Sequence, residues 1–165
     1  MAARYLTVTW EAFHQHARTL AARAWAHGPY RGIVAISRGG LVPAAILARV
    51  LNIRVVETVS VVAYDPGSRG PGSRGPGSQG EEETLGDPVV TKFPAGAGDG
   101  EGFLIVDDLV DTGTTARLVR EILPRARFVC VYAKPLGRGL ADDVVMEVAQ
   151  DTWIVLPWEQ KREGQ

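Results

Sequence analysis

The sequence is poor in several features that mark large classes of protein. Its 165 residues include one cysteine, Cys130, which excludes an intrachain disulfide framework and a cysteine-rich metal site. No apolar run approaches the roughly 18 residues that a membrane-spanning helix needs, and the first residues lack the apolar core of a secretory signal. The formal net charge is −1, so the strongly basic surface of a non-specific nucleic-acid binder is missing as well. We therefore expect one intracellular domain that does not bind nucleic acid.

Lysine is scarce too, and its scarcity singles out one residue. Only three of the 18 basic side chains are lysines. One of them, Lys134, follows the apolar run of residues 127–133, where a long cationic side chain is costly to bury. Lys134 is therefore a candidate functional residue.

Apolar runs and helical patterns alternate along most of the chain. Strands are expected at residues 32–37, 53–64, 103–108, 127–133 and 144–148, and helices at residues 10–27, about 44–51 and about 114–123. Strands that are apolar throughout and alternate with helices predict an α/β fold, a mostly parallel sheet flanked by helices, in one domain over residues 1–165. In such sheets ligands bind beyond the carboxyl ends of the strands. Three polar clusters fall at those ends: residues 37–40, residues 107–115 and Lys134.

The regular pattern disappears in the middle of the chain. The tandem repeats PGSRG, PGSRG and PGSQG run from Pro66 to Gly80 and are followed by three glutamates. Such a sequence buries too little apolar area to offset the entropy lost on ordering, so residues 65–99 are expected to form a mobile Gly/Pro/Ser-rich lid insertion. Its arginines, Arg69 and Arg74, are candidates for contact with an anion, but an inert repeat is the favoured interpretation.

The segment FLIVDDLVDTGTT, residues 103–115, carries the clearest chemistry. Its apolar strand ends in Asp107 and Asp108, and the stretch 111–115 opens the next helix. The unpaired N–H groups at a helix N-terminus form a ready phosphate site, and Gly113 lets the backbone come close. Two carboxylates beside it suit ribose hydroxyls or a Mg²⁺ ion, which prefers oxygen ligands. The segment therefore predicts a site for a phosphorylated sugar.

Other interpretations of these letters fit less well. DDLVD matches the magnesium-binding motif of prenyl synthases, but there the acids lie on a helix, whereas here they follow a strand. The sequence has no Gly-Lys pair and hence no Walker A motif. The glycine-rich residues 96–102 precede a strand, whereas a dinucleotide fingerprint follows one.

The pattern hydrophobic-Asp-Asp-x-x-Asp-Thr-Gly-x-Thr resembles the signature of type I phosphoribosyltransferases, which bind 5-phosphoribosyl 1-pyrophosphate (PRPP). Four segments look like the bacterial xanthine–guanine branch of that family: residues 34–43, 100–112, 133–138 and 150–158. The resemblance covers nearly the whole chain except roughly residues 65–98 and the last few. It implies the type I phosphoribosyltransferase fold and a purine salvage reaction. In that reaction the 5-phosphoribosyl group passes from PRPP to a 6-oxopurine (xanthine, guanine or hypoxanthine) and pyrophosphate is released.

The resemblance also implies roles for the residues of the PRPP site. Arg38 and Gly39 would bind the pyrophosphate, next to a non-proline cis peptide bond that follows Ser37. Asp107 and Asp108 would bind the ribose hydroxyls, with Asp108 as the ligand of the cofactor Mg²⁺. Adjacent strand residues point to opposite faces, so the two acids are not expected to contact one ligand equally. The full set of implied PRPP-binding residues is Arg38, Gly39, Asp107, Asp108, Leu109, Val110, Asp111, Thr112, Gly113, Thr114 and Thr115.

For the purine, the resemblance implies four residues. Lys134 would donate to the oxygen at C6, which selects 6-oxopurines over adenine, and Asp111 would be the catalytic acid/base near N7. Trp153 would stack on the ring, with a core aromatic as the alternative for this residue, and the Ile154 carbonyl would contact the substituent at position 2. The chain departs from the family pattern at Ala63, where a serine hydroxyl is lost, and it has no unambiguous lid arginine.

The implied partners are PRPP and a purine base, and the resemblance implies a homo-oligomer, a tetramer. It also implies a cytoplasmic location, with peripheral association at the inner membrane as a further implication. An alternative from another class is a phosphoribosyltransferase-fold regulator that senses nucleotides and binds RNA with little catalysis. The net charge of −1 argues against this alternative, because RNA binding needs a basic surface.

Overall fold

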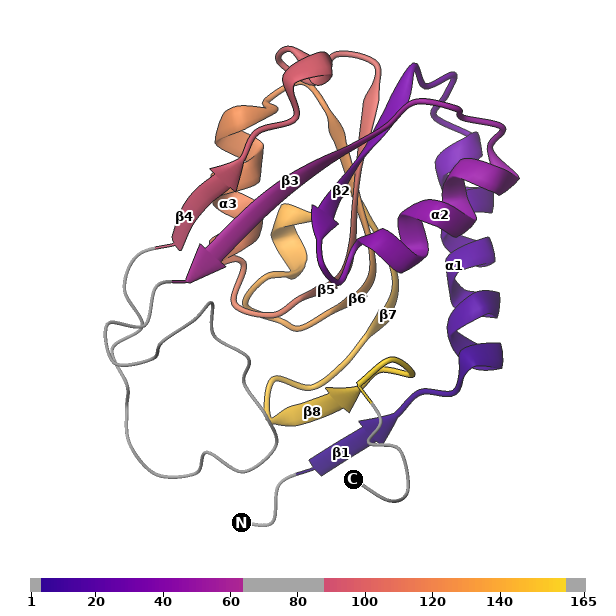
Figure 1. Ribbon diagram of the computed structural model, residues 1–165. Coiled ribbons are helices and arrows are strands. Elements are labelled where there is room, and N and C mark those ends of the chain that lie inside the picture. The colour runs from indigo at the N-terminus through magenta and orange to yellow at the C-terminus, as the bar shows by residue number, and fades with distance from the viewer. Residues whose placement is uncertain (1–3, 64–87, 160–165) are drawn as a thin grey trace.

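The computed structural model describes residues 4–63 and 88–159 (Figure 1). In chain order its elements are β1 (Arg4–Thr7), α1 (Trp10–Trp25), β2 (Gly32–Ser37), α2 (Leu41–Val50), β3 (Val56–Ala63), β4 (Pro88–Lys92), the short 3-10 helix η1 (Ala95–Ala97), β5 (Phe103–Val110), α3 (Thr114–Ile122), β6 (Arg127–Ala133), the 3-10 helix η2 (Arg138–Leu140), β7 (Asp143–Glu147) and β8 (Thr152–Val155). The repeats of residues 66–80, with Arg69 and Arg74, lie outside the described residues.

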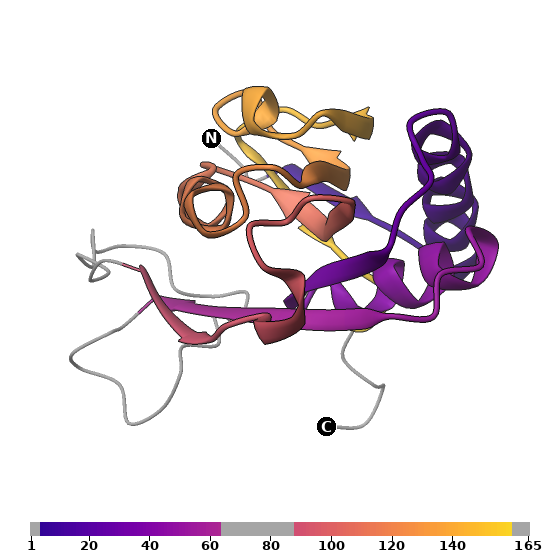
Figure 2. The ribbon, with the colours of Figure 1, turned by 90° about the horizontal axis from the view of Figure 1, so that it is seen from above.

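A six-stranded sheet forms the centre of the fold. Its strand order is β4-β3-β2-β5-β6-β7, and every pair is parallel except β3 with β4. Helices α1 and α2 cover one face, and α3 covers the other (Figure 2). The predicted mostly parallel sheet flanked by helices is therefore confirmed. None of the helices in the described ranges is long and apolar enough to cross a membrane.

Side chains along the central strands sort alternately to the two faces of the sheet. On β2, Ile33 and Ala35 pack on the side of α1 and α2, whereas Val34 and Ile36 pack on the side of α3. All four are buried. Since helices cover both faces, nearly every residue of such a strand must be apolar, which explains the unbroken apolar runs in the sequence.

The helix boundaries follow the expected local signals, with one difference. Thr9 caps α1, and its side chain accepts a hydrogen bond from Ala12 N at 3.1 Å. Helix α2 begins at Leu41, earlier than the expected start near residue 44, so Pro43 lies within its first turn. Proline is tolerated there because a first-turn N–H has no partner inside the helix in any case.

Strands β1 and β8 pair in parallel to form a second sheet, which the sequence pattern does not predict. Each strand has four residues, too few for a clear alternation of apolar and polar side chains. The register places Tyr5 opposite Trp153 and Leu6 opposite Ile154. In Figure 1 this small sheet lies beyond the carboxyl ends of the strands of the large sheet, the edge at which ligands bind in such folds.

Part of the expected lid is regular structure. Within the range 65–99 assigned to a mobile insertion, Pro88–Lys92 form β4 and Ala95–Ala97 form η1. Backbone pairing with β3, which places Val89 opposite Val62, gives β4 its strand structure without help from an apolar pattern, and the mobility of this range stays a prediction. Residues 65–87 of this range lie outside the described residues.

Candidate active site

Three polar clusters meet at the carboxyl edge of the large sheet. Strands β2, β5 and β6 are neighbours in the sheet, so the residues that follow them lie side by side. Two contacts show how close they come: Lys134 N donates to Val110 O at 2.9 Å, and Gly39 lies against the Asp108 carboxylate. The clusters that the sequence singled out therefore form one site.

The loop after β2 packs tightly on the end of β5. The Ser37–Arg38 peptide bond is cis, as the resemblance implies. A Cβ at Gly39 would overlap the carboxylate of Asp108, so only glycine fits there without displacing that group. Ser37 Oγ lies 2.7 Å from Ser60 Oγ of β3. Arg38 is exposed, and its guanidinium makes no hydrogen bond or ion pair with the described residues, which leaves it available for an anion.

Asp107 and Asp108 are adjacent but have different surroundings. Asp107 is 8% exposed, and its Oδ1 accepts a hydrogen bond from Asp108 N at 2.9 Å. Asp108 is more exposed, and its Oδ1 accepts from Leu109 N at 2.7 Å. Burial, and after it the charges of Asp107 and Asp108, raises the pKa of the Cys130 thiol, and burial and the charge of Asp108 raise the pKa of Tyr132 to about 12. Both carboxylates therefore act on Cys130, the residue opposite Asp107 in the sheet, and Asp108 acts on Tyr132 as well.

Burial raises the pKa of both carboxyl groups. The pKa of Asp107 lies well above its usual range, because the group is desolvated and also faces the charge of Asp108. For Asp108, burial raises the pKa from 3.8 to about 6. A carboxylate whose charged form is disfavoured by desolvation is stabilised when a cation comes beside it. Of the two, Asp108 is the group that a cation can reach.

The donors at this edge fit a magnesium ion that is held together with a substrate. Within residues 4–63 and 88–159, no three Asp, Glu, His or Cys side chains converge on one point, so this part of the chain forms no complete metal cage. Mg²⁺ in proteins commonly uses one or two carboxylates and takes its other oxygens from water and substrate phosphates. Asp108 supplies such a carboxylate.

Helix α3 begins just beyond the acidic pair. Gly113, at its N-terminal cap, has a φ of 86°, and a side chain there would collide with Leu140. Thr112 Oγ1 and Thr114 Oγ1 lie 3.1 Å apart, and both residues are exposed. The N–H groups of the first helical turn have no partner inside the helix. Together with the two hydroxyls they offer several donors to a phosphate.

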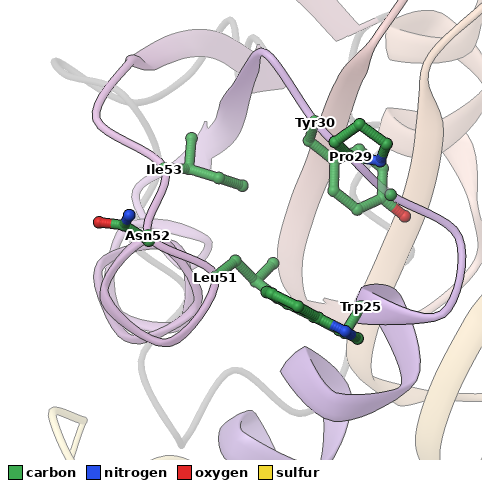
Figure 3. A pocket seen from close by; sticks show the side chains of 7 residues that line it. Trp25, Pro29, Tyr30, Leu51, Asn52 and Ile53 are labelled. Carbon is green, nitrogen blue, oxygen red and sulfur yellow. The ribbon is translucent and has the colours of Figure 1, made fainter.

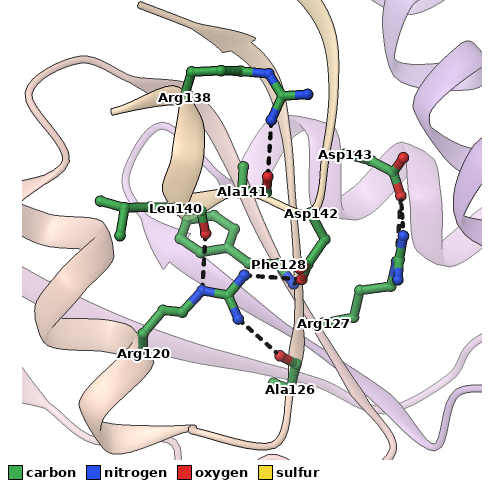
Figure 4. Close-up of polar contacts among 9 residues, drawn as sticks. All are labelled: Arg120, Ala126, Arg127, Phe128, Arg138, Leu140, Ala141, Asp142 and Asp143. Atoms are coloured by element: carbon green, nitrogen blue, oxygen red, sulfur yellow. Dashed lines mark hydrogen bonds and ion pairs between the residues drawn. The ribbon is translucent and has the colours of Figure 1, made fainter. Parts of the chain in front are cut away.

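Arg120 anchors the segment that packs on Gly113 (Figure 4). Its guanidinium donates to Leu140 O at 2.8 Å and to Asp142 Oδ2 at 2.9 Å. Asp142 Oδ2 also accepts from Phe128 N at 2.7 Å. These bonds tie α3 to β6 and to the segment before β7. They therefore fix the wall of residues 111–115, which we call the phosphate loop.

The centre of the site is the Asp111 carboxylate, which is held at both oxygens. Lys134 Nζ lies 3.0 Å from Oδ2, and Gln150 Nε2 donates to Oδ1 at 2.7 Å. Lys134 is 6% exposed, whereas the Asp111 side chain is 48% exposed. A buried ammonium requires a partner, and among the described residues Asp111 is the only ion-pair partner of Lys134. The lysine that the sequence singled out is therefore a buried, paired cation beside the phosphate loop.

Gln150 is a site residue that the sequence reasoning missed. It lies in the turn between β7 and β8, and it bonds to a carboxylate 39 positions earlier in the chain. A lone glutamine in a turn carries no pattern of spacing or composition, so the sequence by itself offers no signal for it.

Strand β8 carries the two remaining predicted residues. Trp153 is 39% exposed, which disfavours the alternative of a simple core aromatic, and Ile154 is buried in the core. The connection between β8 and the site is Gln150, three residues before Trp153. The contacts of Trp153 and Ile154 with a purine stay predictions.

A separate cavity of about 520 Å³ lies at the other end of the sheet (Figure 3). It is lined by the end of α1, the turn before β2 and the segment after α2: Trp25, Gly28, Pro29, Tyr30, Leu51, Asn52 and Ile53. These residues precede β2 and β3 in the chain, so the cavity belongs to the amino ends of the strands. It is therefore distinct from the site at the carboxyl edge.

Comparisons with known proteins point to one family. The model of the phosphoribosyl transferase domain matches residues 8–162. A xanthine-guanine phosphoribosyltransferase of Gluconobacter oxydans is 56% identical over 156 residues, which cover 94% of this chain and 84% of that protein. A protein of the same name from Nitratidesulfovibrio vulgaris is 50% identical over 154 residues, covering 93% of this chain and 84% of that protein.

Solved structures show the same fold. A purine phosphoribosyltransferase from Pyrococcus horikoshii has a TM-score of 0.73 at 26% identity, with 98% of each chain covered. The xanthine-guanine-hypoxanthine phosphoribosyltransferase of Helicobacter pylori has a TM-score of 0.72 at 18% identity, covering 96% of this chain and 94% of that one.

Proposed function

Because this chain belongs to the phosphoribosyltransferase family, we propose that it is a purine salvage enzyme that transfers the 5-phosphoribosyl group of PRPP to a 6-oxopurine and releases pyrophosphate. The observation that carries the proposal is the buried ammonium of Lys134, paired with Asp111 beside the start of α3. The names of the similar proteins favour xanthine and guanine as bases. Hypoxanthine is a third candidate because it has the same oxygen at C6.

PRPP binds across the carboxyl ends of β2 and β5 in this proposal. The stretch 109–115, with its first-turn N–H groups and threonine hydroxyls, holds the 5′-phosphate. Arg38 and the backbone at Gly39 bind the pyrophosphate, and their donors stabilise the negative charge that develops on it as it leaves. Asp108 contacts the ribose hydroxyls, and Asp107 supports Asp108 through the hydrogen bond to its backbone N–H.

Asp108 is also the residue that would hold Mg²⁺. The ion, when bound, would neutralise charge on the pyrophosphate. The remaining contributions to leaving-group stabilisation come from this chain's own donors around Arg38.

Lys134 and Asp111 handle the purine. An ammonium has three N–H donors, so Lys134 can bond Asp111 and still donate to the oxygen at C6 of a 6-oxopurine. Adenine has an amino group at C6, so a hydrogen-bond donor of the base would lie against the Lys134 ammonium, which is also a donor. Asp111, being half-exposed, receives or returns the purine proton near N7 as a nitrogen of the base displaces pyrophosphate from the ribose. Trp153 stacks on the ring, and the Ile154 carbonyl contacts the substituent at position 2.

The test is nucleotide formation with each base in turn. The purified chain is incubated with PRPP, Mg²⁺ and xanthine, guanine, hypoxanthine or adenine, and the product nucleotide is separated and quantified. We expect product with 6-oxopurines and none with adenine. Absence of product with all three 6-oxopurines would contradict the proposal.

The proposal also includes a cytoplasmic location and a homo-oligomeric state. PRPP and nucleotides are multiply charged and do not cross a bilayer unaided, so the enzyme must work where they are made. Exposed apolar side chains at Val50, Val55 and Val56 offer a surface that self-association would cover. Sedimentation of the purified chain tests the oligomeric state.

A nucleotide-sensing regulator without catalysis is not favoured. The similar proteins that cover 93–94% of this chain at 49–56% identity are named as enzymes. The pairing of Asp111 with Lys134, which the proposed reaction uses, is present in this chain.

A further inference from the structure

One side chain bridges the segment after β6 to the phosphate loop. Gln150 Nε2 donates to Asp111 Oδ1 at 2.7 Å, and Gln150 Oε1 accepts from Leu136 N at 3.1 Å. A primary amide has one donor group and one acceptor, and here each is used on a different segment. Gln150 itself comes from a third segment, the turn that leads into β8.

The donated bond completes the restraint of Asp111. Lys134 holds Oδ2 at 3.0 Å and Gln150 holds Oδ1, so the plane of the carboxylate is fixed from both sides. Without Gln150 the half-exposed carboxylate would be tethered at one oxygen only and could turn about that contact. A proton-transferring group that misses its orientation loses rate even when its chemistry is intact.

We propose that Gln150 is the positioning residue of Asp111, an inference that rests on the proposed function. It orients the carboxylate for proton transfer, and it touches neither substrate itself. Its effect therefore falls on turnover, while the binding of PRPP, which depends on Arg38, Asp108 and the start of α3, is unchanged.

The experiment separates the two hydrogen bonds of Gln150. Gln150→Ala removes both bonds. Gln150→Glu is nearly isosteric and still accepts from Leu136 N, but it turns an acceptor toward Asp111 in place of the donor. Gln15→Ala is the matched control, because Gln15 is an exposed glutamine on α1 whose side chain makes no hydrogen bond within the described ranges.

We expect both Gln150 variants to lose about tenfold or more in kcat, the order expected for one lost hydrogen bond to a charged group, with KM for PRPP within about twofold of wild type. Gln15→Ala should match wild type. In an Asp111→Asn background, Gln150→Ala should cause no further loss in kcat, because two residues that act as one unit are not additive.

Several results would overturn the inference. Wild-type kcat in Gln150→Glu would show that only the bond to Leu136 matters. A further tenfold loss in the Asp111→Asn background would show that Gln150 acts by another route. A wild-type protein inactive with every purine would refute the proposed function and this inference with it, whereas an active wild type with unaffected Gln150 variants would refute this inference alone.

Discussion

Replacing Asp108 by asparagine is expected to stabilise the ligand-free protein while it removes the use of PRPP. Burial raises the pKa of Asp108 from 3.8 to about 6 in the folded chain. A carboxyl group with a raised pKa binds its proton more tightly in the folded state, so its ionisation costs stability as the pH rises from about 4 to about 6, and the full cost persists above that. At about 1.4 kcal/mol per pH unit, the difference between the two pKa values corresponds to about 3 kcal/mol.

The asparagine removes this cost and keeps the local hydrogen bond. Its Oδ1 can still accept from Leu109 N, as the carboxylate does at 2.7 Å. It also removes a negative charge that raises the pKa of Asp107. For a chain of this size about 1 kcal/mol corresponds to roughly 2–4 °C, so Asp108→Asn should melt roughly 6–12 °C above wild type at pH 7.5.

Thermal melts at two pH values test the cause of this gain. At pH 4 Asp108 of wild type is largely protonated in the folded state and partly protonated in the unfolded state, so the gain should fall below about 1 kcal/mol. Asp151→Asn is the control, because the Asp151 side chain is 66% exposed and should show no pH-dependent gain. A gain of equal size at both pH values, or a loss at pH 7.5, would refute the reasoning.

Three further substitutions test separate parts of the site. Asp111→Asn should lower kcat with little change in KM for PRPP, whereas Asp108→Asn should raise the PRPP and Mg²⁺ concentrations needed; identical defects in steady-state kinetics would contradict separate roles. Lys134→Ala should lower kcat/KM for 6-oxopurines by at least about tenfold, and retained activity with all of them would make Lys134 structural. Gly39→Ala should raise KM for PRPP severalfold, because the new Cβ would overlap the Asp108 carboxylate. Gly139→Ala, whose Cβ would meet nothing within 4 Å, should match wild type. Equal kinetics in the two variants would contradict the tight packing of the loop after β2 on Asp108.

The parts of the fold that follow from local pattern were predictable. Buried strands such as β5 must be apolar on both faces, and a glycine or proline follows closely after α1 and α3, so the order of strands and helices can be read from the sequence. The polar cluster on β5 was predictable for the same reason, because Asp107 and Asp108 interrupt an apolar run and TGTT follows at the start of a helix, although the strand continues to Val110, two residues beyond its expected end.

The parts of the fold and of the site that depend on pairing between distant segments of the chain could not be predicted from the sequence. Strand β1 pairs with β8 at the other end of the chain, and β4 is held by its pairing with β3. These strands have only four or five residues, too few for a recognisable alternation of apolar and polar side chains. Lys134 stood out because a buried cation is rare, yet its pairing with Asp111 depends on β5 and β6 being neighbours. Gln150 had no such signal, because glutamine is common on protein surfaces and its presence in a sequence does not indicate a functional site.

The most direct measurement is the fate of both phosphorus-containing products in one reaction. Phosphorus NMR of the wild-type chain with PRPP, Mg²⁺ and guanine should show PRPP replaced by a nucleoside monophosphate and pyrophosphate in equal amounts, while the same mixture with adenine stays unchanged. Pyrophosphate without nucleotide, or PRPP that persists with guanine, xanthine and hypoxanthine alike, would contradict phosphoribosyl transfer to a 6-oxopurine.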